Sequence, residues 1–117
     1  MLSRQHRVAH RHFPTILRAS RGWHSPALSL RVATRVLNGG SKSTLFALVV
    51  SRGVASHASD RNKLKRRARA IINNLLPQIK DNYACLLFFK KEALSLSYPQ
   101  LKQLIREIFS RASIIAN

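Results

Sequence analysis

The chain has 117 residues, enough for one domain with a single buried core, and 45% of them are hydrophobic, which excludes wholesale disorder. Twenty-one lysines and arginines face only four acids, so the formal net charge is +17, and such self-repulsion weakens a compact fold unless a polyanion neutralises it. We therefore expect a polyanionic partner, with nucleic acid favoured over an acidic protein or an anionic membrane.

The residues also indicate where the protein works. The only cysteine, Cys85, excludes a disulfide framework, and its apolar neighbours predict a buried, inert thiol, which suits the reducing cytoplasm. No stretch has the 18 or more apolar residues of a transmembrane helix, so no membrane partner is expected. The first 59 residues contain no acid, which is typical of an organellar transit peptide, but folded patterning begins at Val8. We therefore expect one cytoplasmic domain over residues 1–117, with a mobile tail over residues 1–8.

The first half of the chain predicts a helix and two strands. Residues 13–19 are expected to form a short helix, because a proline is tolerated in its first turn and a glycine follows its end. Residues 27–32 alternate apolar and polar side chains, the period of a half-buried strand, and residues 45–50 predict a more buried strand. The turn signal at residues 38–41, Asn-Gly-Gly-Ser, predicts that the two strands pair as an antiparallel hairpin.

A basic helix follows. Ser56 and Ser59 are candidate N-caps, Asp60 suits the first turn, and the helix is expected to end near Leu76, where a proline follows. Steps of about 100° per residue place five apolar side chains in one arc that must face the sheet: Leu64, Ala68, Ile71, Ile72 and Leu75. The opposite face carries Asn62, Lys63, Lys65, Arg66, Arg67 and Arg69, while Arg61 lies at the edge of the apolar arc. A face kept for solubility alternates charges, whereas no acid follows until Asp81, so we interpret this face as a nucleic-acid-binding surface.

The last part of the chain predicts a strand and a helix. Residues 84–89 form a continuous apolar run, which favours a buried central strand. Ser97 is expected to cap a final helix, in which apolar residues recur at i, i+3, i+4, i+7, i+8 and i+11 from Leu101. Together the elements predict an α/β (α+β) two-layer sandwich, a small mixed sheet of about four strands with three helices.

The chemistry of catalysis is missing from the sequence. His6, His10 and His12 lie close together, but no cysteine or carboxylate joins them, so no metal site is expected. The four acids are spread over residues 60–107 and do not form the carboxylate cluster of a metal-dependent nuclease. There is no phosphate-binding glycine loop and no nucleophile elbow. We expect the protein alone to have no catalytic residues.

Two linked segments of the chain form a specific pattern. Val49-Val50-Ser51-Arg52 closes the second strand, and Arg61-Asn62-Lys63-Leu64-Lys65-Arg66 lies in the basic helix. This pattern resembles the protein component of bacterial ribonuclease P, a family in which a strand ending in Val-Ser-Lys-Lys precedes a helix opening Arg-Asn-Arg-(Ile/Leu)-Lys-Arg. The resemblance extends over residues 8–114. It implies the α/β sandwich of the family, with a left-handed βαβ crossover made by residues 45–50, the basic helix and residues 84–89.

The resemblance also implies a function and its site. The family's protein is a subunit of a ribonucleoprotein endoribonuclease; it binds the catalytic ribonuclease P RNA and the 5′ leader of precursor tRNA, and it supports the RNA's use of magnesium. Magnesium would be held mainly by the RNA, and no obligate protein partner is implied. The positions implied to contact RNA are Arg52, Arg61, Asn62, Lys63, Lys65, Arg66, Arg67 and Arg69. The positions implied to line the leader cleft are Phe13, Leu17, Arg31 and Lys90.

Some residues depart from the family pattern. Lys63 replaces the second arginine of the motif and keeps its charge without the planar fork, and Gly53 stands where a second lysine is usual. Leu17 and Arg31 occupy positions where aromatic residues are frequent, so leader binding is expected to depend more on phosphate charge than on stacking. A structural RNA-binding protein of the ribosomal or ribosome-assembly type also fits the size and charge, but the pairing of Arg52 with the helix motif favours the ribonuclease P subunit.

Overall fold

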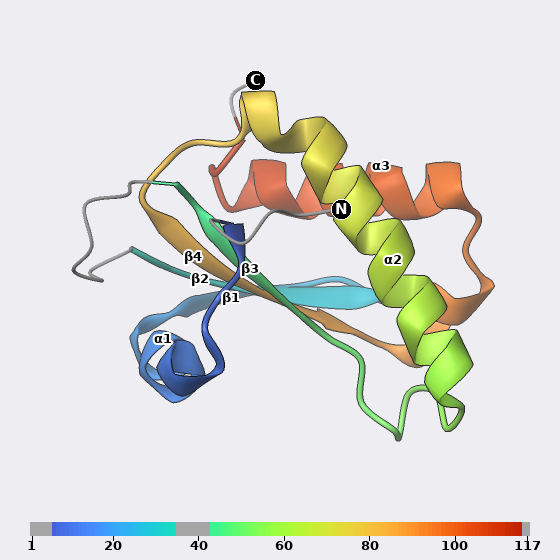
Figure 1. Ribbon diagram of the computed structural model, residues 1–117. Helices are drawn as coiled ribbons and strands as arrows, with labels where there is room; N and C mark the ends of the chain where they lie inside the picture. Colours follow the sequence, from blue (N-terminus) through green and yellow to red (C-terminus); the bar gives the residue numbers. More distant parts are fainter. Residues whose placement is uncertain (1–5, 35–42, 116–117) are drawn as a thin grey trace.

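A four-stranded mixed sheet forms the centre of the molecule (Figure 1). The structure is a computed structural model and describes residues 6–34 and 43–115. The strands lie in the order β1-β2-β4-β3, and β4 pairs antiparallel with β2 and parallel with β3. Their bounds are β1 (Arg21–His24), β2 (Leu28–Thr34), β3 (Leu45–Val49) and β4 (Tyr83–Phe89). The mixed sheet and the parallel crossover from β3 to β4 are thus confirmed, whereas the left hand of that crossover stays a prediction.

The expected antiparallel hairpin is wrong, because β4 lies between β2 and β3. Both hairpin strands form close to their expected positions, but they do not pair with each other. The side chains from Ala84 to Leu87 are all buried, and a strand that is apolar on both faces is most stable at the centre of a sheet. The turn signal at residues 38–41 lies outside the described residues.

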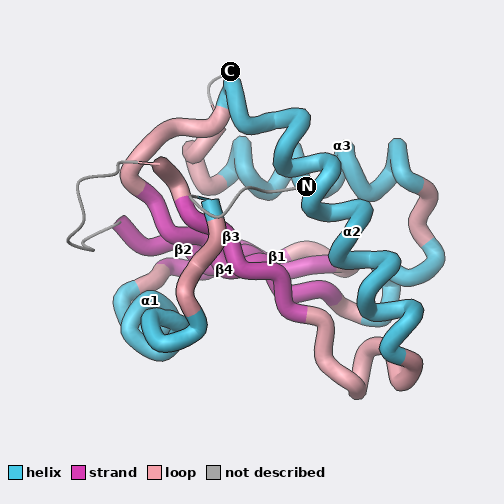
Figure 2. Tube along the Cα trace, viewed as in Figure 1, coloured by secondary structure: helices cyan, strands magenta, loops and turns pink. Residues whose placement is uncertain are grey.

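Three helices cover the sheet unequally (Figures 1 and 2). The 18-residue α2 and the 14-residue α3 lie on one face, and the short α1 lies on the opposite face. The helices are α1 (Phe13–Ala19), α2 (Ala58–Leu75) and α3 (Tyr98–Arg111), with 3-10 turns η2 (His10–His12), η3 (Leu76–Gln78) and η4 (Lys91–Ser95) between them and the neighbouring segments. The sandwich of sheet and helices is confirmed. In the described ranges, no helix has the length and hydropathy needed to cross a membrane.

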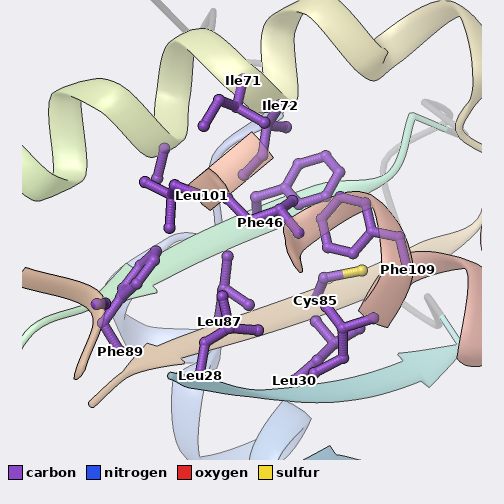
Figure 3. Packing of buried hydrophobic residues seen from close by; sticks show 14 of the residues in the cluster. Leu28, Leu30, Phe46, Ile71, Ile72, Cys85, Leu87, Phe89, Leu101 and Phe109 are labelled. Carbon is purple, nitrogen blue, oxygen red and sulfur yellow. The ribbon is translucent and has the colours of Figure 1, made fainter. Parts of the chain in front are cut away.

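The main core lies between the sheet and the helices α2 and α3 (Figure 3). Alternate residues of each strand face this side, so Leu28 and Leu30 of β2 belong to the same cluster as Ile71 and Ile72 of α2. Phe109 of α3 stacks on Phe46 of β3, with ring centroids 6.0 Å apart. A smaller cluster joins α1 to the other face of the sheet and contains the buried residues Ile16, Ala33, Ala84 and Leu86. The sheet therefore has one fully covered face and one that α1 covers only in part.

The helix ends agree only partly with expectation. Ser97 caps α3 as predicted, in a capping box: its Oγ accepts the Gln100 N–H, and the Gln100 side chain accepts the Ser97 N–H. The predicted caps of α2 are wrong, because His57 occupies the N-cap without a side-chain hydrogen bond, and Ser59 lies inside the helix. Asp60 lies in the first turn, as expected.

The segment before α1 is attached to the sheet. Arg7 forms an isolated parallel bridge with Phe46, and the Val8 N–H donates to the Phe46 carbonyl at 3.1 Å. Val8 also packs against the cluster beneath α1. Residues 7 and 8 are therefore paired with the sheet, and the first five residues lie outside the described part of the chain, so the mobile tail stays a prediction.

Candidate nucleic-acid interface

The basic helix α2 is fixed along one side by the core. Five of its side chains are buried, as the helical rotation predicts: Leu64, Ala68, Ile71, Ile72 and Leu75. Fully burying a leucine or isoleucine stabilises the fold by about 1.5–3 kcal/mol, so this stripe determines which face of α2 turns outward. The orientation of the charged side chains is thus a consequence of core packing.

The opposite face of α2 is a continuous cationic surface, which we call the basic face: Asn62, Lys63, Lys65, Arg66, Arg67 and Arg69. Asn62, Lys63 and Arg66 are exposed, and the other three are half-buried. Within residues 6–34 and 43–115, none of its five cations forms a hydrogen bond or an ion pair. Like charges three and four residues apart destabilise a helix by about 0.2–0.5 kcal/mol per pair. An anionic ligand on this face would remove that cost.

Arg61 is used differently from the other cations of the motif. Its Nη1 donates to the carbonyl oxygens of Ala55 and Ser56, at 2.8 and 3.0 Å. The side chain is half-buried and ties α2 to the loop that joins it to β3. The predicted placement of Arg61 at the edge of the apolar arc is therefore confirmed, but the structure separates it from the basic face.

Arg52 lies on that same loop and is exposed. The loop is closed by the N–H groups of Val54 and Ala55, which both donate to the Ser51 carbonyl. Together with the hydrogen bonds from Arg61, these contacts hold the segment that carries Arg52 in one position beside the start of α2.

Phe13, Leu17 and Arg31, three of the residues expected in the leader cleft, lie on the α1 side of the sheet, and Lys90 directly follows the end of β4. Phe13 of α1 meets Phe88 of β4 in an edge-to-face contact, with centroids 6.2 Å apart, and both rings are half-buried. Leu17 is 37% exposed on α1, and Arg31 of β2 is half-buried on the same face of the sheet. Phe88 is absent from the sequence prediction, because a continuous apolar run does not reveal which of its side chains face the half-covered side.

Two cations on this side are held by hydrogen bonds to neutral groups. Arg31 donates from Nε to the Ser20 Oγ at 2.8 Å and from Nη2 to the Ser20 carbonyl at 2.9 Å, which fixes its guanidinium at the end of α1. Gly22, opposite Arg31 in the sheet, leaves room for it: a Cβ at that position would lie 3.1 Å from the Arg31 Nη1. Lys90 donates from Nζ to the Ser25 carbonyl at 2.6 Å. No acid neutralises either side chain in these contacts.

The remaining reactive groups are not clustered in the described part of the chain. Cys85 is fully buried in the main core, as expected, and burial raises the pKa of its thiol. The described residues bring together no group of three His, Cys, Asp or Glu side chains that could hold a metal ion. Magnesium prefers carboxylate oxygens, and the described residues show no such cluster, so where the ion is held stays a prediction.

The family model and the relatives that match this chain all point to the same family. Residues 2–113 match the family described as Ribonuclease P. The chain is 32% identical over 116 residues to the ribonuclease P protein component of Synechococcus elongatus, covering 97% of this chain and 95% of the relative. It is 27% identical over 128 aligned residues to that of a Cyanothece species, covering 98% of both.

Solved structures agree at the level of the fold. The RNase P protein of Staphylococcus aureus superposes with a TM-score of 0.82 at 15% identity, over 95% of this chain and 98% of the other. The RNase P protein from Thermotoga maritima superposes with a TM-score of 0.78 at 18% identity, over 90% and 96% of the two chains. The α+β arrangement is therefore shared although few residues are.

Proposed function

Because the chain belongs to the ribonuclease P protein family, we propose that the basic face of α2 docks on the ribonuclease P RNA and that the α1 side of the sheet receives the 5′ leader of precursor tRNA. The chain is a protein component of ribonuclease P, a ribonucleoprotein endoribonuclease that processes tRNA. A role as a ribosomal or ribosome-assembly protein is not favoured, because the family match covers nearly the whole chain.

One observation supports the docking proposal above the others. The basic face presents five cations that have no hydrogen-bond or ion-pair partner among the described residues, on a helix whose other side is packed into the core. Because packing against the core fixes the backbone of α2, the positions from which these side chains extend are set before binding, and no backbone ordering is needed when phosphates arrive. Arginine adds a planar fork that grips one phosphate at two points.

The α1 side of the sheet suits a single strand. Phe13 and Phe88 offer aromatic surface, and the described hydrogen bonds of Arg31 and Lys90 go to neutral oxygens of Ser20 and Ser25 rather than to an acid. Nucleic acid strands bind such surfaces by stacking bases on aromatic rings and placing phosphates near cations. The leader would therefore lie across the half-covered face of the sheet.

Magnesium would be held mainly by the RNA, where it supplies the activated water for phosphodiester hydrolysis. The contribution of this chain would be electrostatic: its cations neutralise phosphates of the RNA and of the leader, which brings the two RNA molecules together. The reaction would take place in the cytoplasm.

Reconstitution tests the docking proposal. At low magnesium, the chain should stimulate cleavage of precursor tRNA by a ribonuclease P RNA; a folded protein that fails to do so with its cognate RNA would contradict the proposal. Replacing Arg66 and Arg69 with alanine should weaken RNA binding and lower the slope of log K against log salt by about 1.4–1.8. The control is Lys102→Ala with Arg106→Ala, which removes the same charge from α3 and should change the slope far less.

A second substitution tests the leader site. Leu17→Tyr adds an aromatic ring to the exposed side of α1 and should tighten binding of precursor tRNA by about 1–3 kcal/mol if a leader base stacks there. The salt slope should stay unchanged, because no phosphate contact is added. Mature tRNA without a leader provides the comparison, and an equal gain with that ligand would place the leader elsewhere.

A further inference from the structure

A shallow pocket of about 260 Å³ lies where the first turns of α2 meet η4. Two of its lining residues, Lys63 and Arg67, belong to the basic face and lie on the flank of α2 that turns toward η4, whereas Arg66 and Arg69 do not line the pocket. The pocket combines three apolar side chains, two cations and one acid: Leu64, Ala93, Leu94, Lys63, Arg67 and Asp60.

The wall that η4 contributes is well fixed. Ala93 is buried, and its N–H donates to the Lys90 carbonyl at 3.0 Å, which holds the turn directly after β4. The next residue, Leu94, is left 41% exposed at the rim of the pocket. A single exposed leucine is ordinary, but here it stands opposite two cations that have no partner among the described residues.

We propose that this pocket receives one unstacked base of the RNA on which the chain docks, an inference that rests on the proposed function. Leu94 and Ala93 would contact the face of the base, and Lys63 and Arg67 would neutralise the phosphates on either side of it. Proteins recognise RNA sequence mainly at loops and bulges, where bases are splayed out in this way. The pocket is slightly smaller than the roughly 300–1,000 Å³ of sites for drug-sized ligands, which suits a single base.

Asp60 argues for a base rather than for a second phosphate or an acidic peptide. A carboxylate at the pocket repels an anion, but it accepts a hydrogen bond from an exocyclic amino group. Adenine, cytosine and guanine carry such a group and uracil does not. The pocket should therefore favour a base with an amino group, and the basic face and the pocket together would distinguish a folded RNA from an arbitrary polyanion.

Two variants of Leu94 test the proposal, in the full-length chain bound to ribonuclease P RNA. Leu94→Ala should weaken binding roughly fivefold, because apolar contact is lost, and should leave the salt slope unchanged. Leu94→Lys should also weaken binding, because it blocks the pocket. On a surface that binds only phosphates, the added charge would instead tighten binding and steepen the slope by about 0.9. Gln103→Lys on the outer side of α3 is the control for charge.

Chemical probing identifies the base directly. Dimethyl sulfate and kethoxal together should modify one unpaired adenine, cytosine or guanine of the free RNA that the wild-type chain protects. This protection should disappear with Leu94→Lys, while backbone protection along the basic face remains. If Leu94→Lys binds more tightly than wild type, or if no base-specific protection depends on Leu94, the pocket proposal is overturned and the docking proposal stands. If the wild-type chain does not bind the RNA, both are overturned.

Discussion

At the scale of single residues, Arg61 has the most unexpected position. It opens the motif that resembles the family's RNA-binding segment, yet its guanidinium donates to two carbonyl groups of the preceding loop. The same loop carries the exposed Arg52. We therefore expect Arg61 to act as a positioning residue that holds this loop, although its contact with RNA stays a prediction.

Replacing Arg61 with alanine should separate this role from phosphate binding. The salt slope of RNA binding should remain that of wild type, because no phosphate contact is lost. The Val54 and Ala55 amides should exchange hydrogen faster, and the free energy of unfolding should fall by about 1 kcal/mol, since two carbonyl groups lose a donor. Hydrogen exchange, urea unfolding and a salt titration measure the three effects. A drop in slope of about 0.9 would instead make Arg61 a phosphate ligand.

The sequence predicts the placement of some of these residues better than that of others. Helical rotation alone places Leu64 and Ala68 in the core and Arg61 at its edge, because a helix of constant pitch leaves little freedom. It does not reveal the hydrogen bonds of Arg61, which depend on where the loop carbonyls lie. Phe88 could be found only once the register of β4 was known, since every residue of that run is apolar enough for either face.

At the scale of elements, the N-cap of α3 shows that a serine stabilises a helix start only where its side chain accepts a backbone hydrogen bond. Ser97→Ala should lower the free energy of unfolding by about 1 kcal/mol, because it removes the acceptor of the Gln100 N–H. Ser56 and Ser59 are equally good caps by residue type, yet neither caps α2, so alanine at either position should change stability by less than about 0.5 kcal/mol. Urea unfolding of the three variants compares them. An equal loss for Ser59→Ala would mean that α2 begins differently in solution.

The positions of the strands were easier to predict than the order in which the strands pair in the sheet. Alternation and apolar runs locate β2, β3 and β4, but β1 has three exposed residues out of four and is maintained by pairing with β2. Pairing order depends on contacts between distant segments, so a turn signal between two strands suggested a hairpin that the sheet does not contain. The apolar character of β4 was the better guide, because it requires neighbours on both sides.

At the scale of the whole molecule, one face of the sheet mainly supports stability, and the other face leaves side chains accessible for binding. The covered face supplies the main core and orients α2, and the half-covered face leaves aromatic and cationic side chains accessible. The fold is shared with RNase P proteins at only 15–18% identity, which fits a fold specified by its apolar pattern. The apolar pattern could be read from the sequence, and the formal charge of +17 led to the prediction of a polyanionic partner.

Because the molecule is so basic, removing cations from α2 should raise the stability of the free chain and lower its affinity for RNA. Replacing Arg66 and Arg69 with alanine relieves repulsion along α2, so the free chain should be more stable at low salt, by about 0.2–0.5 kcal/mol for each like-charge pair removed. The same variant should bind RNA more weakly. Added salt should stabilise the wild-type chain and shrink the difference, because the Debye length falls from about 10 Å at 0.1 M to 3 Å at 1 M.

Thermal or urea unfolding of the wild-type chain and of the Arg66 and Arg69 variant, at several salt concentrations and with and without RNA, measures these opposite effects on stability and binding. RNA at one hundred times its Kd should stabilise the wild-type chain by about 2.7 kcal/mol, and at the same RNA concentration the variant should gain less. Lys102→Ala with Arg106→Ala is again the control, since it removes equal charge away from the basic face. If the Arg66 and Arg69 variant is less stable than wild type at low salt, and salt does not change the difference, the basic face does not cost the free protein stability, and its cations must be supported by contacts within the fold.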